Sequence, residues 1–387
     1  ALFYNMSSAG KAPAKAPAGQ NKGGFRDRRL SVAGVEETLP AVPKKDGTPG
    51  AGGRRARRMS MSPEMGVIKP KALLPFALET VGTYSCHGVE PGMRQGETSA
   101  KINQDRGCVC YPFGPEGCQK TMALFCVFDG HGACGDKVSH YAMNQIQQKL
   151  EEHPAIVDNP EKAMKETFVE VDASLRKDQS IDAELSGTTA VVCLFVLEAS
   201  GKLVIHTANV GDSRATIGQK LPAGKQAKKY DLSEDQKPDT PAEMKRIKKA
   251  GGYVSPPEEE WGGPARVWLD ANMTLPGLAM ARSIGDHLVK TVGVISEPEV
   301  TKYETKEGDA FLVMASDGVW EFIESPECVQ LVDEFIATSA TEACTRLIET
   351  AAAKWRQEEG DYRDDITAIC VRIDDVKKEM ASLATTG

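Results

Sequence analysis

The sequence predicts an α+β domain built in layers, with mainly antiparallel sheets. Two β-rich segments, 189–197 and 202–209, are separated by Ala199-Ser200-Gly201, a pattern typical of a β-hairpin. Other segments carry apolar residues at helical spacing. Strands and helices follow one another in mixed order, without the regular alternation that a parallel sheet needs. This order is the reason for predicting antiparallel layers.

Four helices can be assigned from the sequence. Apolar residues fall on one helical face around 138–150, around 164–175 and around 343–351. A capping box at Thr240-Pro241-Ala242-Glu243 predicts the fourth helix, and Gly251-Gly252 supplies its left-handed stop.

Buried strands and the limits of the folded domain can also be assigned. Residues 310–315 and 366–373 are continuous apolar runs and are expected to be buried strands. We expect the folded domain to span 78–375 and residues 376–387 to form a C-terminal tail.

Residues 1–77 differ from the rest of the chain because they are basic and rich in Pro and Gly. The first 72 residues carry 14 Lys and Arg against 5 Asp and Glu, a balance of +9, which leaves −17 for the remainder. Such a segment cannot bury enough apolar surface to offset the entropy of ordering, so we expect a disordered leader. Its charge suits an acidic partner or a large assembly. Ser31 and Ser60, each preceded by two Arg, are candidate phosphorylation sites.

Composition excludes several classes of protein. The acidic body is not expected to bind nucleic acid. No run of about 18 apolar residues is present, so no membrane span is expected, and we expect no signal peptide. Ten Cys scattered through core-like segments favour reduced thiols. We therefore expect a cytoplasmic protein, associated with the cytoskeleton or another assembly through its leader.

Four Asp residues lie at the ends of predicted strands. Asp129 and Asp317 each follow an apolar strand and precede a Gly; Asp212 follows the segment 204–210, and Asp364 comes just before 366–373. A lone Asp-Gly after a strand is usually a turn, but four such residues indicate a shared site.

Converging carboxylates would repel one another unless cations neutralised them. Oxygen ligands select hard ions such as Mg²⁺ or Mn²⁺. Two such ions about 4 Å apart activate a water and stabilise in-line displacement at phosphorus. His131, two residues after Asp129, is a candidate general acid for the leaving oxygen; the alternative is a polar turn residue.

Six motifs follow one another along roughly residues 78–375. They are Asp129-Gly130-His131-Gly132, Ser186-Gly187-Thr188-Thr189, Gly211-Asp212-Ser213-Arg214, Ser283-Ile284-Gly285-Asp286, Ser316-Asp317-Gly318 and Asp364-Asp365-Ile366-Thr367. In this order the set resembles the metal-dependent type 2C protein serine/threonine phosphatases. The resemblance implies a central antiparallel β-sandwich flanked by helices on both sides, in four layers (α/β/β/α).

The resemblance also implies a two-metal site at one edge of the sandwich, with Mg²⁺ or Mn²⁺ as cofactor. By residue, Asp129 resembles the ligand that bridges both ions, and the Gly130 carbonyl would bind the second. Asp317 and Asp364 resemble the other ligands of the first ion. Asp212 resembles a ligand of a weaker third ion. His131 resembles the general acid, and Arg214 and Asp286 resemble supporting residues.

Two positions depart from the family pattern. Gln104-Asp105 stands where the family usually has Glu-Asp, which removes one negative charge from the second-metal site, although Asp105 could compensate through water. The usual phosphate-binding Arg is missing, and Lys101 is the nearest candidate for contact with the substrate phosphate. Lysine would act there as a point charge and not as a bidentate clamp.

The expected function is therefore metal-dependent hydrolysis of phosphoserine and phosphothreonine in proteins, by a metal-bridged hydroxide with help from His131. No Cys has an Arg six residues further on, which argues against a cysteine-dependent phosphatase. The alternative is a phosphatase-like scaffold or regulatory subunit with weak or no activity, anchored in a larger assembly by its leader. Gln104 and the missing Arg motivate that alternative.

Overall fold

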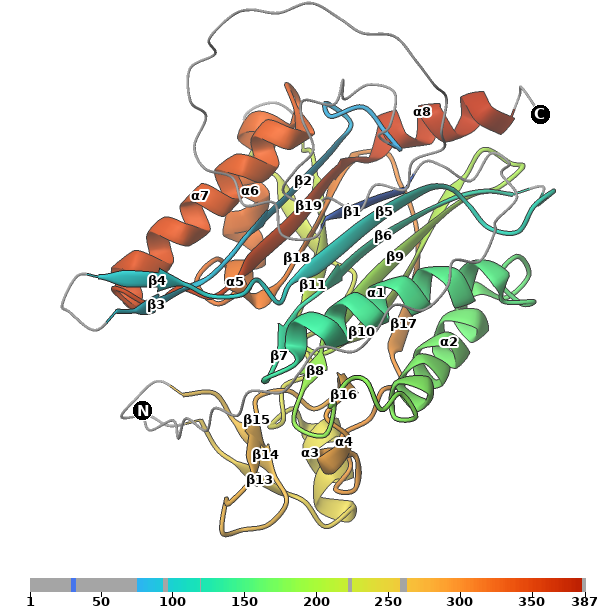
Figure 1. Cartoon of the computed structure of the whole chain (residues 1–387). Coiled ribbons are helices and arrows are strands. Elements are labelled where there is room, and N and C mark those ends of the chain that lie inside the picture. Colours follow the sequence, from blue (N-terminus) through green and yellow to red (C-terminus); the bar gives the residue numbers. More distant parts are fainter. Residues whose placement is uncertain are drawn as a thin grey trace, which may run out of the picture.

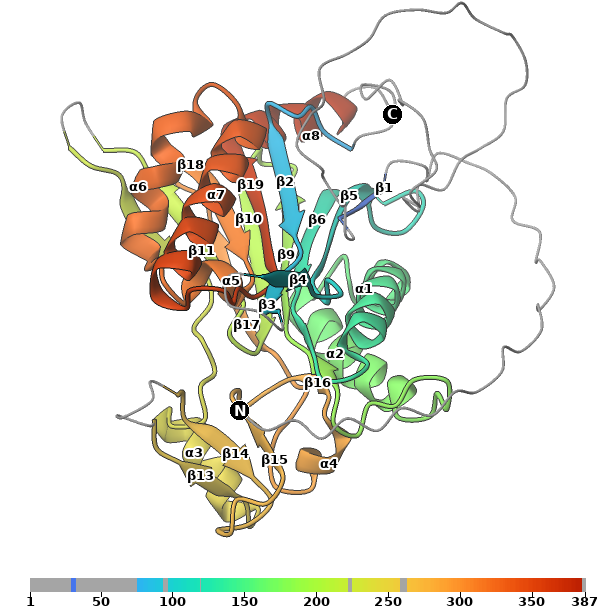
Figure 2. The same cartoon turned by 60° about the vertical axis from the view of Figure 1, so that its left-hand side comes forward.

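The protein is described by a computed structural model, which covers residues 29–32, 75–92, 97–118, 120–221, 225–257 and 263–384. Two antiparallel sheets pack face to face, and helices cover the outer face of each (Figure 1). Turned by 60°, Figure 2 shows α6 and α7 beside one sheet and α1 and α2 beside the other. The predicted four-layer α/β/β/α fold is confirmed.

The first sheet has six strands, all paired antiparallel. In spatial order they are β1 (Arg29–Val32), β5 (Arg106–Phe113), β6 (Thr121–Phe128), β9 (Ala190–Leu197), β10 (Leu203–Val210) and β17 (Glu299–Glu304). The predicted hairpin is β9 and β10, which pair Leu197 with Leu203.

The second sheet has five strands, also antiparallel. In spatial order they are β12 (Lys228–Asp231), β11 (Arg214–Gln219), β18 (Asp309–Ala315), β19 (Ile366–Arg372) and β2 (Val81–Cys86). The two predicted buried strands are β18 and β19, which lie side by side in the middle of this sheet.

Three apolar cores hold the four layers together. Alternate side chains of the first sheet, such as Leu124 and Cys126, face helices α1 (Gly135–Glu152) and α2 (Pro160–Leu175). Their neighbours, such as Phe125, face the second sheet. The far side of the second sheet packs on α6 (Ser325–Ile336) and α7 (Ala340–Glu358). Successive side chains of a strand point to opposite faces of its sheet, so each strand contributes to two of the three interfaces.

Shorter elements complete the fold. Below the sandwich in Figure 1 lie α3 (Pro241–Lys249), β13 (Tyr253–Ser255), β14 (Arg266–Trp268) and β15 (Pro276–Leu278), with a small core of their own. The remaining elements are β3 (Val89–Pro91), β4 (Thr98–Ala100), β7 (Gly130–His131), β8 (Gly187–Thr188), β16 (Ile284–Gly285), α4 (His287–Lys290) and α5 (Asp317–Trp320).

The end of the chain differs from the prediction of a loose tail after residue 375. Residues Ile373–Ala384 form helix α8, and its Val376 and Met380 side chains are fully buried. The Tyr111 hydroxyl donates a hydrogen bond to the backbone oxygen of Glu379 at 3.0 Å. The prediction was wrong because a short helix at a chain end becomes stable only through a partner surface, here the edge of the sandwich.

Two further expectations were wrong in detail. Thr240 precedes α3, but its side chain makes no capping hydrogen bond, because Glu243 is instead paired with Arg246 and Arg282. The leader was expected to be disordered, but its residues 29–32 form strand β1, which pairs with the edge strand β5. Backbone groups at an open sheet edge can pair with a segment that has no alternating apolar pattern. The rest of the leader before residue 75, including Ser60, lies outside the described residues.

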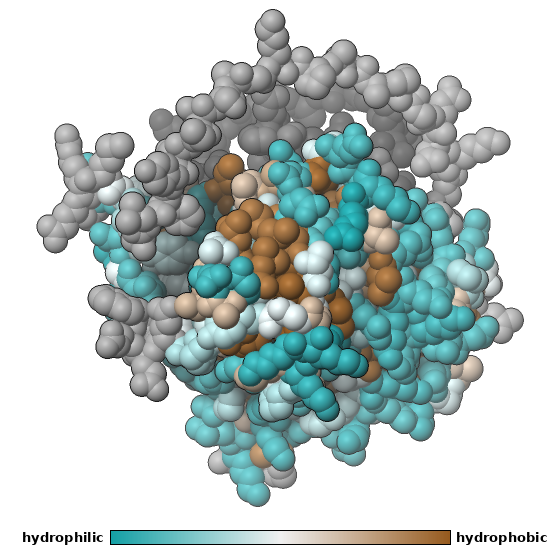
Figure 3. All heavy atoms as spheres, turned by 90° about the horizontal axis from the view of Figure 1, so that it is seen from below, coloured by the Kyte–Doolittle hydropathy of each residue, from teal (hydrophilic) through white to brown (hydrophobic). Residues whose placement is uncertain are grey.

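The face seen from below is mixed in polarity. Figure 3 shows apolar residues gathered near its middle, with hydrophilic residues around them.

None of the helices in the described ranges is both long and apolar enough to span a bilayer.

Candidate active site

A small three-stranded sheet brings three distant motifs to one end of the sandwich. Its order is β16-β8-β7, with Gly130 paired to Thr188 and Ile284 paired to Thr188 on the other side. Gly130 packs so closely against Gly135 and Gln104 that a Cβ would overlap their backbone oxygens. Glycine is therefore required where this turn leaves β6.

Strand pairing explains why the predicted carboxylates lie close together. The start of β5 lies beside the end of β6, since Arg106 pairs with Phe128, and this brings Asp105 next to Asp129. The end of β18 lies beside the start of β19, since Ala315 pairs with Ala368, and this brings Asp317 next to residue 364.

The pKa shifts show how strongly these groups interact. Burial raises the pKa of Asp129, and the neighbouring carboxylates of Asp317, Asp105 and Asp364 raise it further. Burial is the main cause that raises the pKa of Asp317 to about 7, and the negative charges of Asp212 and Asp364 add to it. The structure thus brings all five predicted aspartates within electrostatic reach of one another.

Unmet hydrogen-bonding capacity marks this cluster as a place for cations. Asp105 Oδ2 accepts a hydrogen bond of 2.7 Å from the Ser316 hydroxyl, but Asp105 Oδ1 is buried and accepts none from the described part of the chain. Asp212 Oδ1 is likewise buried without a partner among the described residues. Buried carboxylate oxygens of this kind are stabilised by hard divalent cations.

The cluster does not form a complete metal cage from side chains alone. Within the described ranges, no three His, Cys, Asp or Glu side chains are grouped in a way that could hold an ion by themselves. Lys101 forms an ion pair with Asp364, and Lys237 forms one with Asp212. The donor set therefore fits hard cations only together with backbone oxygens, water and movement of these lysines.

Gln104 is held in place through both its backbone and its side chain. Its backbone N–H donates to Asp365 Oδ2 at 2.7 Å, and its backbone oxygen accepts from the Ser139 hydroxyl at 2.6 Å. Its side-chain amide donates to the Gly132 oxygen at 2.8 Å. Asp365 therefore positions the loop that carries Gln104.

Sequence reasoning missed Lys237 and Tyr362. Lys237 Nζ lies 2.7 Å from Asp212 Oδ2, and the Tyr362 hydroxyl lies 3.4 Å from Asp364 Oδ2. Lys237 follows the acidic turn Glu234-Asp235, which was a usable signal, because a cation beside acidic residues often pairs with one. Tyr362 carries no such signal, because only the fold places its hydroxyl at the site.

His131 is paired with a second buried acid. Its Nε2 lies 2.8 Å from Asp286 Oδ2, and the Asp286 side chain is only 5% exposed. Burial lowers the pKa of His131, but the carboxylate of Asp286, followed by those of Asp212 and Asp317, raises it by more in total, so the pKa ends above its ordinary value. His131 is therefore held protonated further into the neutral range.

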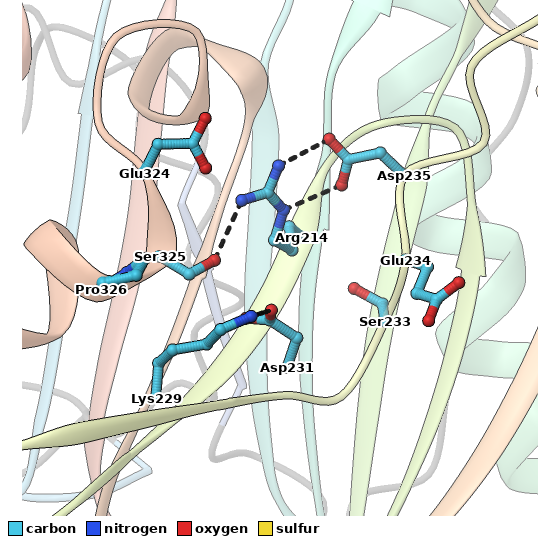
Figure 4. A pocket seen from close by; sticks show the side chains of 9 residues that line it. All are labelled: Arg214, Lys229, Asp231, Ser233, Glu234, Asp235, Glu324, Ser325 and Pro326. Atoms are coloured by element: carbon cyan, nitrogen blue, oxygen red, sulfur yellow. Dashed lines mark hydrogen bonds and ion pairs between the residues drawn. The ribbon is translucent and has the colours of Figure 1, made fainter. Parts of the chain in front are cut away.

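Arg214, predicted as a supporting residue, lies in a separate pocket at the edge of the second sheet (Figure 4). Its guanidinium donates two hydrogen bonds to Asp235, at 2.9 and 2.7 Å, and one to Ser325 at 2.9 Å. It also stacks 5.0 Å from the centre of the Trp320 ring. These contacts tie the acidic turn to the start of α6.

Comparison with known proteins agrees with the arrangement of motifs. The family model described as protein phosphatase 2C matches residues 89–360. The chain belongs to the protein phosphatase 2C family. "Probable protein phosphatase 2C 35" of Arabidopsis thaliana is 34% identical over 72% of this chain and 81% of its own. "Probable protein phosphatase 2C 48" of rice is 36% identical over the same shares.

Solved structures support the protein phosphatase 2C fold. A serine-threonine phosphatase 2C from Toxoplasma gondii superposes with a TM-score of 0.62 at 20% identity, over 76% of this chain and 94% of that one. A sex-determining protein of C. elegans superposes with a TM-score of 0.57 at 20% identity, over 79% and 68%. At such identity the likeness concerns the fold alone. The comparisons give no support to the alternative of a non-catalytic scaffold.

Proposed function

We propose that this protein hydrolyses phosphoserine and phosphothreonine in proteins and depends on divalent metal ions for this activity. The observation that carries the proposal is the buried cluster around Asp129, whose pKa is raised by its burial and by three neighbouring carboxylates. Proteins rarely bury so many carboxylates without a cation. In a member of the protein phosphatase 2C family, this cluster is best explained as a metal site that serves phosphate hydrolysis.

The metal ligands would come from the predicted set. Asp129 would contact two ions, the Gly130 carbonyl the second, and Asp317 and Asp364 the first, with Asp212 at a weaker third. Gln104 and Asp105 would contribute through water. When bound, Mg²⁺ or Mn²⁺ supplies Lewis acidity and an activated water nucleophile.

The other site residues would handle protons and phosphate. His131, kept protonated by Asp286, would donate its proton to the departing serine or threonine oxygen. Lys101 would supply a positive charge for the substrate phosphate. No disulfide joins the ten Cys, all of which lie in the described ranges, and this supports a cytoplasmic location.

The test is release of phosphate from a phosphoserine or phosphothreonine peptide, with and without Mn²⁺. We expect release that requires Mn²⁺ and falls by on the order of 10³-fold or more in Asp129→Asn combined with Asp317→Asn. Asp374→Asn, an exposed carboxylate on α8, is the matched control and should keep full activity. Undiminished activity in the double variant would refute the proposal.

A further inference from the structure

Lysine side chains neutralise two carboxylates of the acidic cluster, Asp364 and Asp212, but not the other three. Lys101 Nζ lies 2.7 Å from Asp364 Oδ1, and Lys237 Nζ lies 2.7 Å from Asp212 Oδ2. Across the described ranges, the other three carboxylates, Asp105, Asp129 and Asp317, form no ion pair. A divalent ion that binds the cluster therefore meets two carboxylates that an ammonium already occupies.

Several contacts hold Lys101 in this position. Its backbone N–H donates to the Gly88 oxygen at 2.9 Å, and a Cβ on Gly88 would lie only 2.9 Å from Lys101 Cδ. Its ammonium lies 3.3 Å from the Tyr362 hydroxyl and 5.1 Å from the centre of that ring. The Lys101 side chain is 17% exposed and the Asp364 side chain 36%, so the ammonium is better shielded from solvent than that of a surface lysine, while the carboxylate stays partly open.

Both carboxylate oxygens of Asp364 already have partners while Lys101 is bound. Its Oδ1 accepts from Lys101 and from the backbone N–H of Asp365 at 2.8 Å, and its Oδ2 faces the Tyr362 hydroxyl. A divalent ion needs one of these oxygens, and its charge repels an ammonium held against the same carboxylate. Both cations cannot occupy Asp364 without a large electrostatic cost.

We propose that Lys101 is a built-in counter-ion of Asp364, which a divalent metal ion must displace in order to bind. This inference rests on the proposed function, because it assumes that Asp364 is a metal ligand. Metal binding then frees the Lys101 ammonium, and the freed ammonium can turn to the substrate phosphate. Lys101 thereby couples metal loading to phosphate binding, and it weakens metal binding compared with the same site without it.

The first test is calorimetric titration of the full chain with Mn²⁺. Lys101→Met keeps most of the aliphatic stem and removes the charge, so it should bind Mn²⁺ at least about fivefold more tightly than the wild type. Lys137→Met removes an exposed charge on α1 and should leave the affinity unchanged. Equal or weaker binding by Lys101→Met would overturn the inference while leaving the proposed function intact. Failure of both wild type and Lys101→Met to bind Mn²⁺ would refute the proposed function itself.

A second test uses the wild-type chain and so does not depend on how the variant folds. Surface lysines are labelled briefly with an amine-reactive ester, and each site is quantified by mass spectrometry with and without Mn²⁺. We expect labelling of Lys101 to rise severalfold when Mn²⁺ is added, and labelling of Lys137 to stay the same. Labelling of Lys101 that does not change with saturating Mn²⁺ would show that the ammonium stays on Asp364, which contradicts the inference.

Discussion

His131 Nε2 lies 2.8 Å from Asp286 Oδ2, although the two residues are 155 positions apart in the sequence. The contact forms because β7 and β16 flank the same short strand β8. Asp286 has a left-handed backbone conformation, with φ of 50°, at the start of α4. This uncommon conformation for a non-glycine residue aims its carboxylate at the histidine.

Removing the charge of Asp286 should weaken proton donation by His131. In Asp286→Asn we expect the pKa of His131 to fall, because burial then acts without the opposing carboxylate. The decline of activity with rising pH should move to lower pH, and kcat at neutral pH should drop by on the order of 10²-fold. NMR titration of the His131 ring and a pH–rate profile measure both effects. Glu166→Gln, which removes the acid beside His153, is the control; an unshifted profile in Asp286→Asn would contradict the role of this pair.

Gly187 should be essential to the same contact. A Cβ at this position would overlap Asp286 Oδ2 and lie 2.7 Å from His131 Nε2. Gly187→Ala is therefore expected to lower kcat by at least tenfold while Mn²⁺ affinity stays unchanged. Gly201→Ala is the control, because it strains a turn with φ of 80° but has nothing within 4 Å of the added methyl. If Gly187→Ala loses no more activity than Gly201→Ala, the close packing has no catalytic consequence.

The metal-free protein should become less stable as pH rises from about 5 to about 8. The folded pKa of Asp317 is about 7, raised from 3.8, so the folded state binds a proton that the unfolded state has lost. The stabilisation is complete below the unfolded pKa and disappears as pH rises through the folded pKa. One such group contributes a slope of up to about 1.4 kcal/mol per pH unit.

Urea unfolding in a chelating buffer at several pH values measures this slope. Asp317→Asn should show a shallower slope than the wild type, and saturating Mn²⁺ should remove most of the dependence, because the ions replace the bound protons. Stability that is flat or rising between pH 5 and pH 8 without metal would show that the carboxylates do not repel one another as the structure indicates.

Helix α8 should contribute substantially to the stability of the sandwich. Met380 is fully buried among strands of both sheets, so Met380→Ala should lower the free energy of unfolding by about 2–5 kcal/mol. Lys378→Ala, on the exposed side of the same helix, should change it by less than about 0.5 kcal/mol. Chemical denaturation compares the two, and equal effects would mean that the helix does not pack as described.

Most of the fold could be predicted because its signals are local. Helices α1, α2 and α7 and strands β9, β10, β18 and β19 each carry an apolar pattern that matches their burial. Helix α8 and strand β1 could not be predicted in the same way. Their positions depend on surfaces supplied by other parts of the chain, and such tertiary contacts leave little trace in a short segment.

The sequence predicts the aspartates of the candidate site, but not which side chains contact each of them. Four of the five aspartates follow or precede a recognisable strand and could be found by reading strand ends, whereas Asp105 was predicted only from the family resemblance. The partners of these acids come from elsewhere in the chain: Lys237 holds Asp212, and Tyr362 faces Asp364 together with Lys101. Side-chain reach across the folded site decides which cation meets which carboxylate, and in the sequence only the acidic turn before Lys237 indicates such a partner.

Anomalous scattering from crystals grown with Mn²⁺ tests the central claim most directly. The account predicts two strong peaks on either side of the Asp129 carboxylate, with Asp317 and Asp364 contacting the first and the Lys101 ammonium withdrawn from Asp364. Well-ordered crystals at saturating Mn²⁺ with no peak beside Asp129 would contradict it.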